Sequence, residues 1–432
     1  MNRIASASLL TTALFAASYA QTVAATPTLT PEIKSGLLAT LTQRVTQFAF
    51  VPGKDFSTFP TILTQFQPKI DAASTTTDFA SVLNDALSKL GVSHMNVITP
   101  EAATARATGG TVGIGIQLEI TDKGIKLLAV YPKSPADVGG LKAGDTIISV
   151  NGVKPKSRED LAGPVGTSFI LKLEGPDGKV RDAKVTKAFF STREPESLTW
   201  KKATAILRIP TFDGTVQRGK EPTGYNADNV AKLIEEAQPK AKFLIVDLRN
   251  NPGGVVLNML SFAGYFIPRE MPMGSFVNRN SSAMFVKETG SKPDDLKAFS
   301  AWDKAPIKPF GHTIRFACPI AVLVNGGTGS AAEMMAEALR DTVGARVFGQ
   351  KSIGMVLASV ITPLDPIGTP REKRTGFQMI VPIQDYITVK GHRIEGNGVM
   401  PDVPVSGNVT ATKDPVIDAA MAWIATNPKP KI

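Results

Sequence analysis

The first candidate for chemistry in this 432-residue chain is a serine that follows two glycines. In "VLVNGGTGSAAEMMAEAL", residues 322–339, an apolar run ends at Asn325-Gly326-Gly327 and a helix-like segment opens at Ser330. A strand, a tight turn and a serine at the start of a helix together suit a nucleophile. A serine hydroxyl reacts poorly unless a neighbouring base takes its proton. The chain must therefore supply such a base as well.

A second glycine-rich turn follows another apolar run, in "DLRNNPGG" at residues 247–254. Loops that follow parallel strands meet at one edge of the sheet, so we expect the two turns to lie together. The backbone N–H groups of Gly253, Gly254 and Ala331 would then form an oxyanion hole. The plainer alternative is a tight turn in which glycine supplies a positive φ. A phosphate cradle is a rival interpretation, but neither turn is followed by the Lys-Ser/Thr pair that a P-loop requires.

The surrounding pattern predicts the elements that must position these turns. From residue 200 onward, strand-like runs such as "AKFLIVD" alternate with helical runs such as "NADNVAKLIEEAQ", which indicates an α/β core with a largely parallel sheet. Residues 31–90 carry helical periodicity, and residues 108–190 carry short β runs broken by turns. The expected fold is therefore multidomain α/β. Its predicted parts are a leader at 1–25, a helical domain at 26–105, a β-rich domain at 106–190 and an α/β core at 191–432.

The β-rich part resembles a PDZ domain in two stretches, "VGIGIQ" and "GLKAGDTIISVNG". Successive backbone N–H groups at Gly113, Ile114, Gly115 and Ile116 could hold a peptide carboxylate, and the adjoining strand edge could pair with the peptide. The sequence thus predicts a site for peptide C-termini in this domain.

Composition narrows the class of protein. The net charge is +10, but it is spread along the chain without a Lys/Arg block, so we expect no nucleic-acid partner. The first 25 residues read as a secretory signal peptide, cleaved after Ala20 or Ala25, so we expect a secreted or periplasmic protein without a membrane span. The only cysteine is Cys318, expected as a buried structural thiol, and it allows no intrachain disulfide. The chain has one cysteine and three histidines, and their positions do not match the spacing of zinc ligands. We therefore expect neither metal nor cofactor.

Four stretches in order, "DLRNNPGG", "VNGGTGSAAEMMAEALRD", "GQKSIGM" and "IEGNGVMPDVPV", resemble the carboxy-terminal processing peptidases, or tail-specific proteases. With the PDZ-like insert, the resemblance covers about residues 30 to 410 and implies a crotonase-like α/β core. It implies that Ser330 is the nucleophile, in the position of the family's Ser-Ala-Ser-Ala-Ser-Glu stretch. Ser330 also fits a helix N-cap with Glu333 completing a capping box, and one residue can do both.

The chain departs from the family at the base. The usual members carry a lysine in a Phe-Gly-Lys-Gly segment with a glutamine four residues later, but this chain has Met355 and Ser359 there. A thioether cannot take the proton of a serine at neutral pH. Lys351 lies four residues before Met355 and is a poor substitute. Ser352 and Ser359 are poorer nucleophile candidates than Ser330, because neither opens a helix after a Gly-Gly turn.

The remaining candidate base is a histidine. The stretch around His94, "LGVSHMNVITPEA", resembles the Ser-His segment of the tricorn-protease branch, in which histidine is the base. That resemblance implies a set of Ser330, His94, Ser93 and Glu395, with Ser93 and Glu395 orienting the imidazole. His312 and His392 are expected at the edge of the core and at a hairpin turn.

Together these patterns predict a secreted serine endopeptidase that cleaves unfolded or C-terminally exposed polypeptides. The alternative is an inactive pseudopeptidase that binds peptide C-termini as a scaffold, and Met355 is the residue that favours it.

Overall fold

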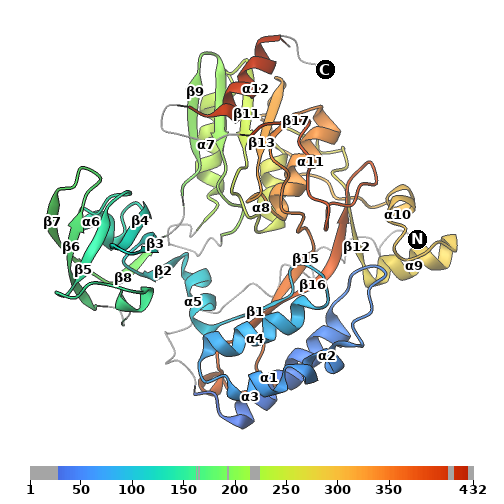
Figure 1. Cartoon of the computed structure of the whole chain (residues 1–432). Coiled ribbons are helices and arrows are strands. Elements are labelled where there is room, and N and C mark those ends of the chain that lie inside the picture. The colour runs from blue at the N-terminus through green and yellow to red at the C-terminus, as the bar shows by residue number, and fades with distance from the viewer. Residues whose placement is uncertain are drawn as a thin grey trace. The chain divides into compact units, whose positions relative to one another are not determined.

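The computed structural model describes residues 28–161, 163, 166–191, 194–214, 224–406 and 413–426. The predicted signal peptide, residues 1–25, lies outside the described residues. The chain divides into two compact units: Thr104–Glu194 forms one, and Met1–Ala103 with Pro195–Ile432 forms the other. The helix α5 (Pro100–Thr108) runs across the boundary between them (Figure 1).

The unit Thr104–Glu194 is built on an antiparallel five-stranded sheet in the order β3-β4-β5-β6-β7. Its elements are β2 (Gly110–Gly113), β3 (Ile116–Thr121), β4 (Gly124–Val130), α6 (Pro135–Val138), β5 (Thr146–Val150), the 3-10 helix η2 (Arg158–Leu161), β6 (Ser168–Glu174), β7 (Val180–Thr186) and β8 (Ala188–Ser191). Strands β2 and β8 pair as a separate ribbon. Residues such as Ile125, Leu127, Ile147 and Leu171 form its core.

The larger unit is organised around a six-stranded sheet in the order β17-β14-β13-β11-β10-β9 (Figure 1). All neighbouring pairs are parallel except β9 with β10. Its strands are β9 (Ser197–Lys201), β10 (Thr204–Arg208), β11 (Phe243–Asp247), β13 (Ile320–Val324), β14 (Arg346–Gly349) and β17 (Val403–Pro404). The parallel strands therefore end at a common edge, where the loops that follow β11 and β13 begin.

Both faces of the inner strands β10, β11 and β13 are buried, as expected for parallel strands covered by helices. Alternate residues point to opposite faces, so Leu244 and Val246 join one core while Ile245 joins the other. The first core includes residues of α7 (Ala227–Ala237), α8 (Val256–Ala263) and α11 (Ala331–Val343). The second includes residues of α12 (Pro415–Thr426). Helix α11 is rich in alanine and methionine, and all its residues from Ala331 to Leu339 are buried.

A second sheet, antiparallel, carries the N-terminal helices. Its strands are β1 (Asn96–Ile98), β12 (Ser275–Asn278), β15 (Ala358–Pro363) and β16 (Gln378–Ile387), with β16 pairing all three others. The N-terminal helices are α1 (Pro31–Gln43), the π-helix η1 (Arg44–Phe48), α2 (Phe59–Gln65), α3 (Gln67–Ala72) and α4 (Thr76–Ser88). The remaining helices of the unit are α9 (Arg279–Thr289), α10 (Leu296–Trp302) and the 3-10 helix η3 (Arg371–Lys373).

The N-terminal helices share a hydrophobic core with this second sheet. Phe79 of α4 packs edge-on against Phe377, with ring centroids 5.7 Å apart, and Met379 and Val381 of β16 lie in the same cluster. The helices therefore belong to the same compact unit as the central sheet, whereas the sequence led us to expect residues 26–105 as a domain of their own. This shared core fixes the loop after α4 relative to the C-terminal half of the chain.

The predicted multidomain α/β class is confirmed. Within the described ranges, the structure has no helix that is both long enough and apolar enough to cross a membrane.

Candidate active site

Ser330 lies at the N-terminus of α11, directly after the loop that leaves β13. Its backbone has φ 53° and ψ −124°, a conformation that non-glycine residues rarely adopt. Its N–H donates to the Met355 carbonyl oxygen at 2.9 Å. A strained serine on a sharp turn between a strand and a helix is typical of nucleophiles in hydrolases, where the surrounding structure must hold the strain.

The carboxylate of Glu333 holds this turn together. Glu333 is fully buried, and its Oε2 accepts hydrogen bonds from the N–H groups of Ser330 at 3.0 Å and Met355 at 2.9 Å. Its Oε1 accepts from the Gly354 N–H at 2.7 Å and from the Ser352 hydroxyl. Burial raises the pKa of Glu333 above 4.5, while the four hydrogen bonds oppose that shift. One carboxylate thus ties Ser330 to the segment 352–355.

The glycines after β11 approach the Ser330 turn closely. A Cβ placed on Gly253, whose φ is 94°, would lie 2.6 Å from the Ser330 Cβ and 2.8 Å from the Ala331 nitrogen. Only glycine therefore fits at this position. The Gly253 N–H, however, donates to Asn251 Oδ1 at 2.8 Å, so it is already engaged. Among the described residues, the N–H groups of Gly254 and Ala331 have no hydrogen-bond acceptor.

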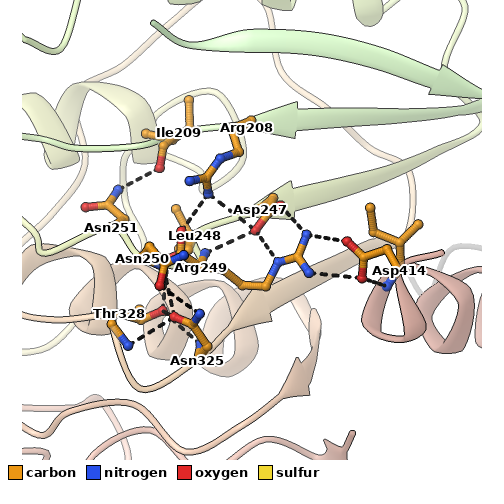
Figure 2. A network of polar contacts seen from close by, with 12 residues as sticks. Arg208, Ile209, Asp247, Leu248, Arg249, Asn250, Asn251, Asn325, Thr328 and Asp414 are labelled. Atoms are coloured by element: carbon orange, nitrogen blue, oxygen red, sulfur yellow. Dashed lines mark hydrogen bonds and ion pairs between the residues drawn. The ribbon is translucent and has the colours of Figure 1, made fainter. Parts of the chain in front are cut away.

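A pair of asparagines joins the two glycine-rich loops, as Figure 2 shows. The Asn250 N–H donates to Asn325 Oδ1 at 2.8 Å, and Asn325 Nδ2 donates to Asn250 Oδ1 at 2.9 Å. Thr328 continues the network by donating its hydroxyl to the Leu248 carbonyl at 2.9 Å. Because these loops follow neighbouring parallel strands, the asparagine pair fixes their spacing next to Ser330.

An ion-pair chain anchors the loop after β11 from the other side (Figure 2). The buried Asp247 accepts from Arg249 Nε at 2.9 Å and Nη2 at 2.7 Å, and Arg249 also pairs with Asp414 at 2.8 Å. Arg208 lies 3.6 Å from Asp247 and donates to the Arg249 carbonyl at 2.6 Å. Arg208, Asp247 and Arg249 line a pocket of about 290 Å³ at the carboxyl edge of the central sheet.

The structure brings Glu395 next to the adjacent residues Ser93 and His94, although Ser93 lies 302 positions earlier in the sequence. Ser93 Oγ lies 2.8 Å from His94 Nδ1 and donates to Glu395 Oε2 at 2.9 Å. The Ser93 N–H donates to Glu395 Oε1 at 3.1 Å. His94, like Ser330, has a positive φ of 53°.

The direction of these bonds determines the tautomer of the imidazole. The carboxylate of Glu395 can only accept, so the single Ser93 hydroxyl proton goes to it. The hydroxyl oxygen must then accept from His94 Nδ1–H, because it has no second proton to give. The lone pair of the neutral imidazole is therefore on Nε2, where a base needs it.

The loop that carries Ser93 and His94 is clamped to the helices and the sheet. Asn84 of α4 accepts from the Val97 N–H at 2.6 Å and donates to the Val97 carbonyl at 3.1 Å. In β1, Asn96 and Val97 are in register with Ile380 and Met379 of β16. The turn between α4 and β1 is thus held at both ends.

One peptide group connects Ser330 with Glu395. The Met355 carbonyl accepts the Ser330 N–H at 2.9 Å, and the N–H of the same peptide, on Val356, donates to Glu395 Oε2 at 2.9 Å. Met355 thus contributes its backbone at the position where the family usually has a lysine side chain.

The other candidates from the sequence lie elsewhere. His312 stacks on Tyr265, with ring centroids 3.9 Å apart, and its Nε2 lies 2.9 Å from the Ser261 carbonyl, which makes it a packed residue. His392 is exposed at a turn, and its N–H donates to Thr388 Oγ1 at 3.0 Å.

Lys351 and Cys318 have no place in this arrangement. The Cε of Lys351 lies 3.2 Å from the position of a Cβ on Gly398, so its side chain lies along that loop. Cys318, expected as a buried thiol, is half-buried, and burial raises its pKa to about 11.

Ser352 is buried, with its hydroxyl bonded to Glu333 and accepting the Val399 N–H.

The predicted carboxylate-binding stretch, Gly113 to Ile116, connects β2 to β3. The Ile114 carbonyl accepts from the Ala136 N–H at 2.7 Å, and the Gly115 carbonyl accepts from the Tyr131 N–H at 3.0 Å. Within the described strands, β3 is an edge strand that pairs only with β4. Its other edge is the kind to which a peptide can add as a further strand.

Sequence reasoning missed two features of the site. One is that Glu333 also accepts hydrogen bonds from the segment 352–355, whereas it was expected only as a helix-capping partner of Ser330. The other is Asn251, whose side chain takes the Gly253 N–H and donates to the Ile209 carbonyl at 2.9 Å. The signal available was the pair of asparagines before the Pro-Gly-Gly turn, because asparagine often bonds to the backbone two residues on.

Comparisons with known proteins agree with this architecture. Residues 203–405 match peptidase family S41, and residues 127–175 match the PDZ domain family. The chain is 26% identical over 339 residues to carboxyl-terminal-processing peptidase 1, chloroplastic, of Arabidopsis thaliana, which covers 74% of this chain and 61% of that protein. It is 26% identical over 306 residues to a probable CtpA-like serine protease of Staphylococcus aureus (strain N315), covering 69% of this chain and 53% of that protein.

The matched region thus spans only about half to three fifths of these relatives. The solved structure of mature CPAF complexed with lactacystin has a similar fold, with a TM-score of 0.52 and 16% identity over 92% of this chain and 98% of that one. The expected resemblance to the carboxy-terminal processing peptidases is confirmed: residues 203–405 match peptidase family S41, and the region that matches the PDZ domain family precedes them in the chain.

Proposed function

We propose that this chain is a serine endopeptidase in which Ser330 is the nucleophile and His94 is the base. The observation that carries the proposal is the hydrogen-bonded set of Ser93, His94 and Glu395, which leaves the imidazole lone pair on Nε2. The strained backbone of Ser330 and its placement at the start of α11 support its role as nucleophile.

In the proposed reaction His94 Nε2 takes the Ser330 hydroxyl proton as Ser330 Oγ attacks the scissile carbonyl carbon. The carbonyl π electrons move to oxygen, and the N–H groups of Gly254 and Ala331 stabilise the oxyanion. Gly253 serves by its lack of a side chain, since its own N–H is held by Asn251.

The acyl-enzyme forms when the carbonyl is restored and the C–N bond breaks, with the proton of His94 passing to the leaving amine. A water molecule then attacks the ester carbon as His94 takes one of its protons; the bond from that carbon to Ser330 Oγ breaks, Oγ receives the proton from His94, and the product leaves with a new carboxyl end. This histidine mechanism is the one that the tricorn-like branch resemblance implies.

We propose polypeptides that are unfolded or have exposed C-termini as substrates, bound in part through the PDZ domain. Both curated relatives carry names of proteases, one of them of a carboxyl-terminal-processing peptidase. The signal-like sequence of residues 1–25 supports a secreted or periplasmic location.

The test is hydrolysis of casein by purified variants. We expect activity to vanish in Ser330→Ala and in His94→Ala and to persist in Met355→Ala. Hydrolysis that is unchanged in His94→Ala would remove His94 from the mechanism.

The second candidate function is an inactive scaffold that binds peptide C-termini. The observation that favours it is Met355, which occupies the position of the family's lysine. A wild-type protein that binds peptides but hydrolyses none, at any pH from 5 to 9, would establish this alternative.

A further inference from the structure

The segment before β15 presents two apolar side chains to solvent. Its residues alternate: Ser352, Gly354 and Val356 are buried, whereas Ile353 and Met355 are 51% and 36% exposed. The inward residues are fixed by polar contacts, with Gly354 N–H bound to Glu333 and Val356 N–H bound to Glu395. Because the inward side is held so firmly, the outward side chains are presented at defined positions.

These two side chains border the turn that carries Ser330. The Met355 carbonyl accepts the Ser330 N–H at 2.9 Å, so the Met355 Cα lies next to the nucleophile. The Ile353 N–H donates to the Thr328 carbonyl at 3.1 Å, and Ile353 Cγ2 lies 3.1 Å from the position of a Cβ on Gly329. A polypeptide whose carbonyl reaches Ser330 must therefore pass beside them.

We propose that Ile353 and Met355 select the substrate, by contacting its side chains next to the scissile bond and favouring apolar residues there. This inference rests on the proposed peptidase function and specifies its substrate class. An apolar substrate side chain gains by leaving water against Ile353 and Met355. A charged side chain at the same place loses hydration without finding an opposite charge.

Apolar contact with Ile353 and Met355 predicts a measurable ratio between the kcat/KM values of apolar and charged substrates. Contacts with an apolar wall distinguish substrates by roughly 10- to 200-fold in kcat/KM. Replacing Met355 by glutamate would add a negative charge beside Ser330 and should move the preference toward substrates with lysine. It would leave the backbone hydrogen bond from Ser330 to residue 355 in place, because that bond uses only the carbonyl.

The experiment uses the full chain and a set of peptides that differ at one residue next to a cleavage site mapped in casein by mass spectrometry. Leucine, alanine, glutamate and lysine are compared at that residue by kcat/KM. We expect the wild type to favour leucine over glutamate by at least about tenfold, and Met355→Glu to shift the lysine-to-leucine ratio upward by a similar factor. Ile353→Glu serves as a second, independent variant.

The matched control is Ile367→Glu, because Ile367 is an isoleucine that is 80% exposed in the loop between β15 and β16. It adds the same charge and should leave every ratio unchanged. Equal kcat/KM for the four peptides, with ratios that neither Met355→Glu nor Ile353→Glu alters, would overturn the inference while the peptidase function stands. Failure of the wild type to cleave any peptide would contradict the peptidase function itself, and the inference with it.

Discussion

Ser330 and Glu395 bind opposite ends of the same peptide group. The Met355 carbonyl accepts the Ser330 N–H, and the Val356 N–H of that peptide donates to Glu395, each at 2.9 Å. Glu395 in turn accepts the Ser93 hydroxyl proton at 2.9 Å. The peptide group between Met355 and Val356 thus links Ser330 to the Glu395 carboxylate, which binds Ser93 next to His94.

The Glu395 carboxylate is expected to set the tautomer of His94. In Glu395→Gln, an amide N–H₂ replaces one acceptor oxygen, although Ser93 N, Ser93 Oγ and Val356 N all donate to this group. If the amide N–H₂ introduced at position 395 points at the Ser93 hydroxyl, that hydroxyl can no longer donate to residue 395. It would donate to His94 Nδ1 instead, and the imidazole would then carry its own proton on Nε2. We expect kcat to fall by roughly 10²- to 10⁴-fold, as measured with a cleaved casein peptide.

Glu395→Asp is the control for this variant, since it keeps a carboxylate and should retain more activity than Glu395→Gln. Activity of Glu395→Gln within about twofold of the wild type would show that the carboxylate does not orient the base.

The turn around Ser330 was predictable because its signals are local. An apolar run, two glycines and an alanine-rich helix within 18 residues are enough to indicate a strand, a turn and a helix, and the structure has β13 and α11 there. The strand in "AKFLIVD" likewise appears as β11. Periodicity and turn residues determine such elements without reference to distant parts of the chain.

The contacts between distant segments were not predictable from such signals. Ser93 and Glu395 are separated by 302 positions, and only the resemblance to a known branch suggested that they belong together. The shared core of α4 and β16 was missed because the apolar face of a helix shows that it is buried but not what covers it. The capture of the Gly253 N–H by Asn251 depends on a side-chain orientation that spacing cannot give.

Glu333 is expected to give the protein a specific pH dependence of stability. Burial raises its pKa in the folded state above the ordinary 4.5, so the folded state holds this proton more tightly than the unfolded chain does. Its contribution to the free energy of unfolding is therefore greatest below pH 4.5 and declines as the pH rises through the folded-state pKa. Relative to Glu333→Gln, the wild type should lose stability over that window.

The measurement for Glu333 is urea unfolding of the wild type and Glu333→Gln from pH 4 to pH 8. Ser352→Ala removes one of the four donors without removing the carboxylate and should keep the wild-type trend. If the wild type instead gained stability relative to Glu333→Gln as the pH rises, the four hydrogen bonds and not burial would dominate the pKa of Glu333.

Arg249 is expected to be essential for the loop after β11. In Arg249→Ala the buried Asp247 would lose both of its bonds to the Arg249 guanidinium, and we expect the free energy of unfolding to fall by about 3–5 kcal/mol. Urea unfolding at pH 7 measures this change. Lys201→Ala, which breaks the exposed Lys201–Asp418 pair, is the control and should change stability by less than about 1 kcal/mol. Equal effects of the two variants would rule out a special role for the Arg249 network.

The PDZ domain is expected to bind peptides by their free C-termini. With Ser330→Ala to prevent hydrolysis, a peptide ending in an apolar residue with a free carboxylate should bind at least roughly tenfold tighter than its C-terminal amide, because backbone N–H groups bind the anion more strongly. Isothermal titration gives both dissociation constants. Equal constants would argue against carboxylate binding at residues 113–116.

The most direct test of the central claim is covalent labelling of Ser330 by a fluorophosphonate, located by peptide mass spectrometry. The account predicts that the wild type and Met355→Ala are labelled at Ser330 at similar rates, and that His94→Ala is labelled at least roughly 100-fold more slowly, because the hydroxyl loses its base. An equal labelling rate in His94→Ala, or no labelling of Ser330 in the wild type, would contradict it.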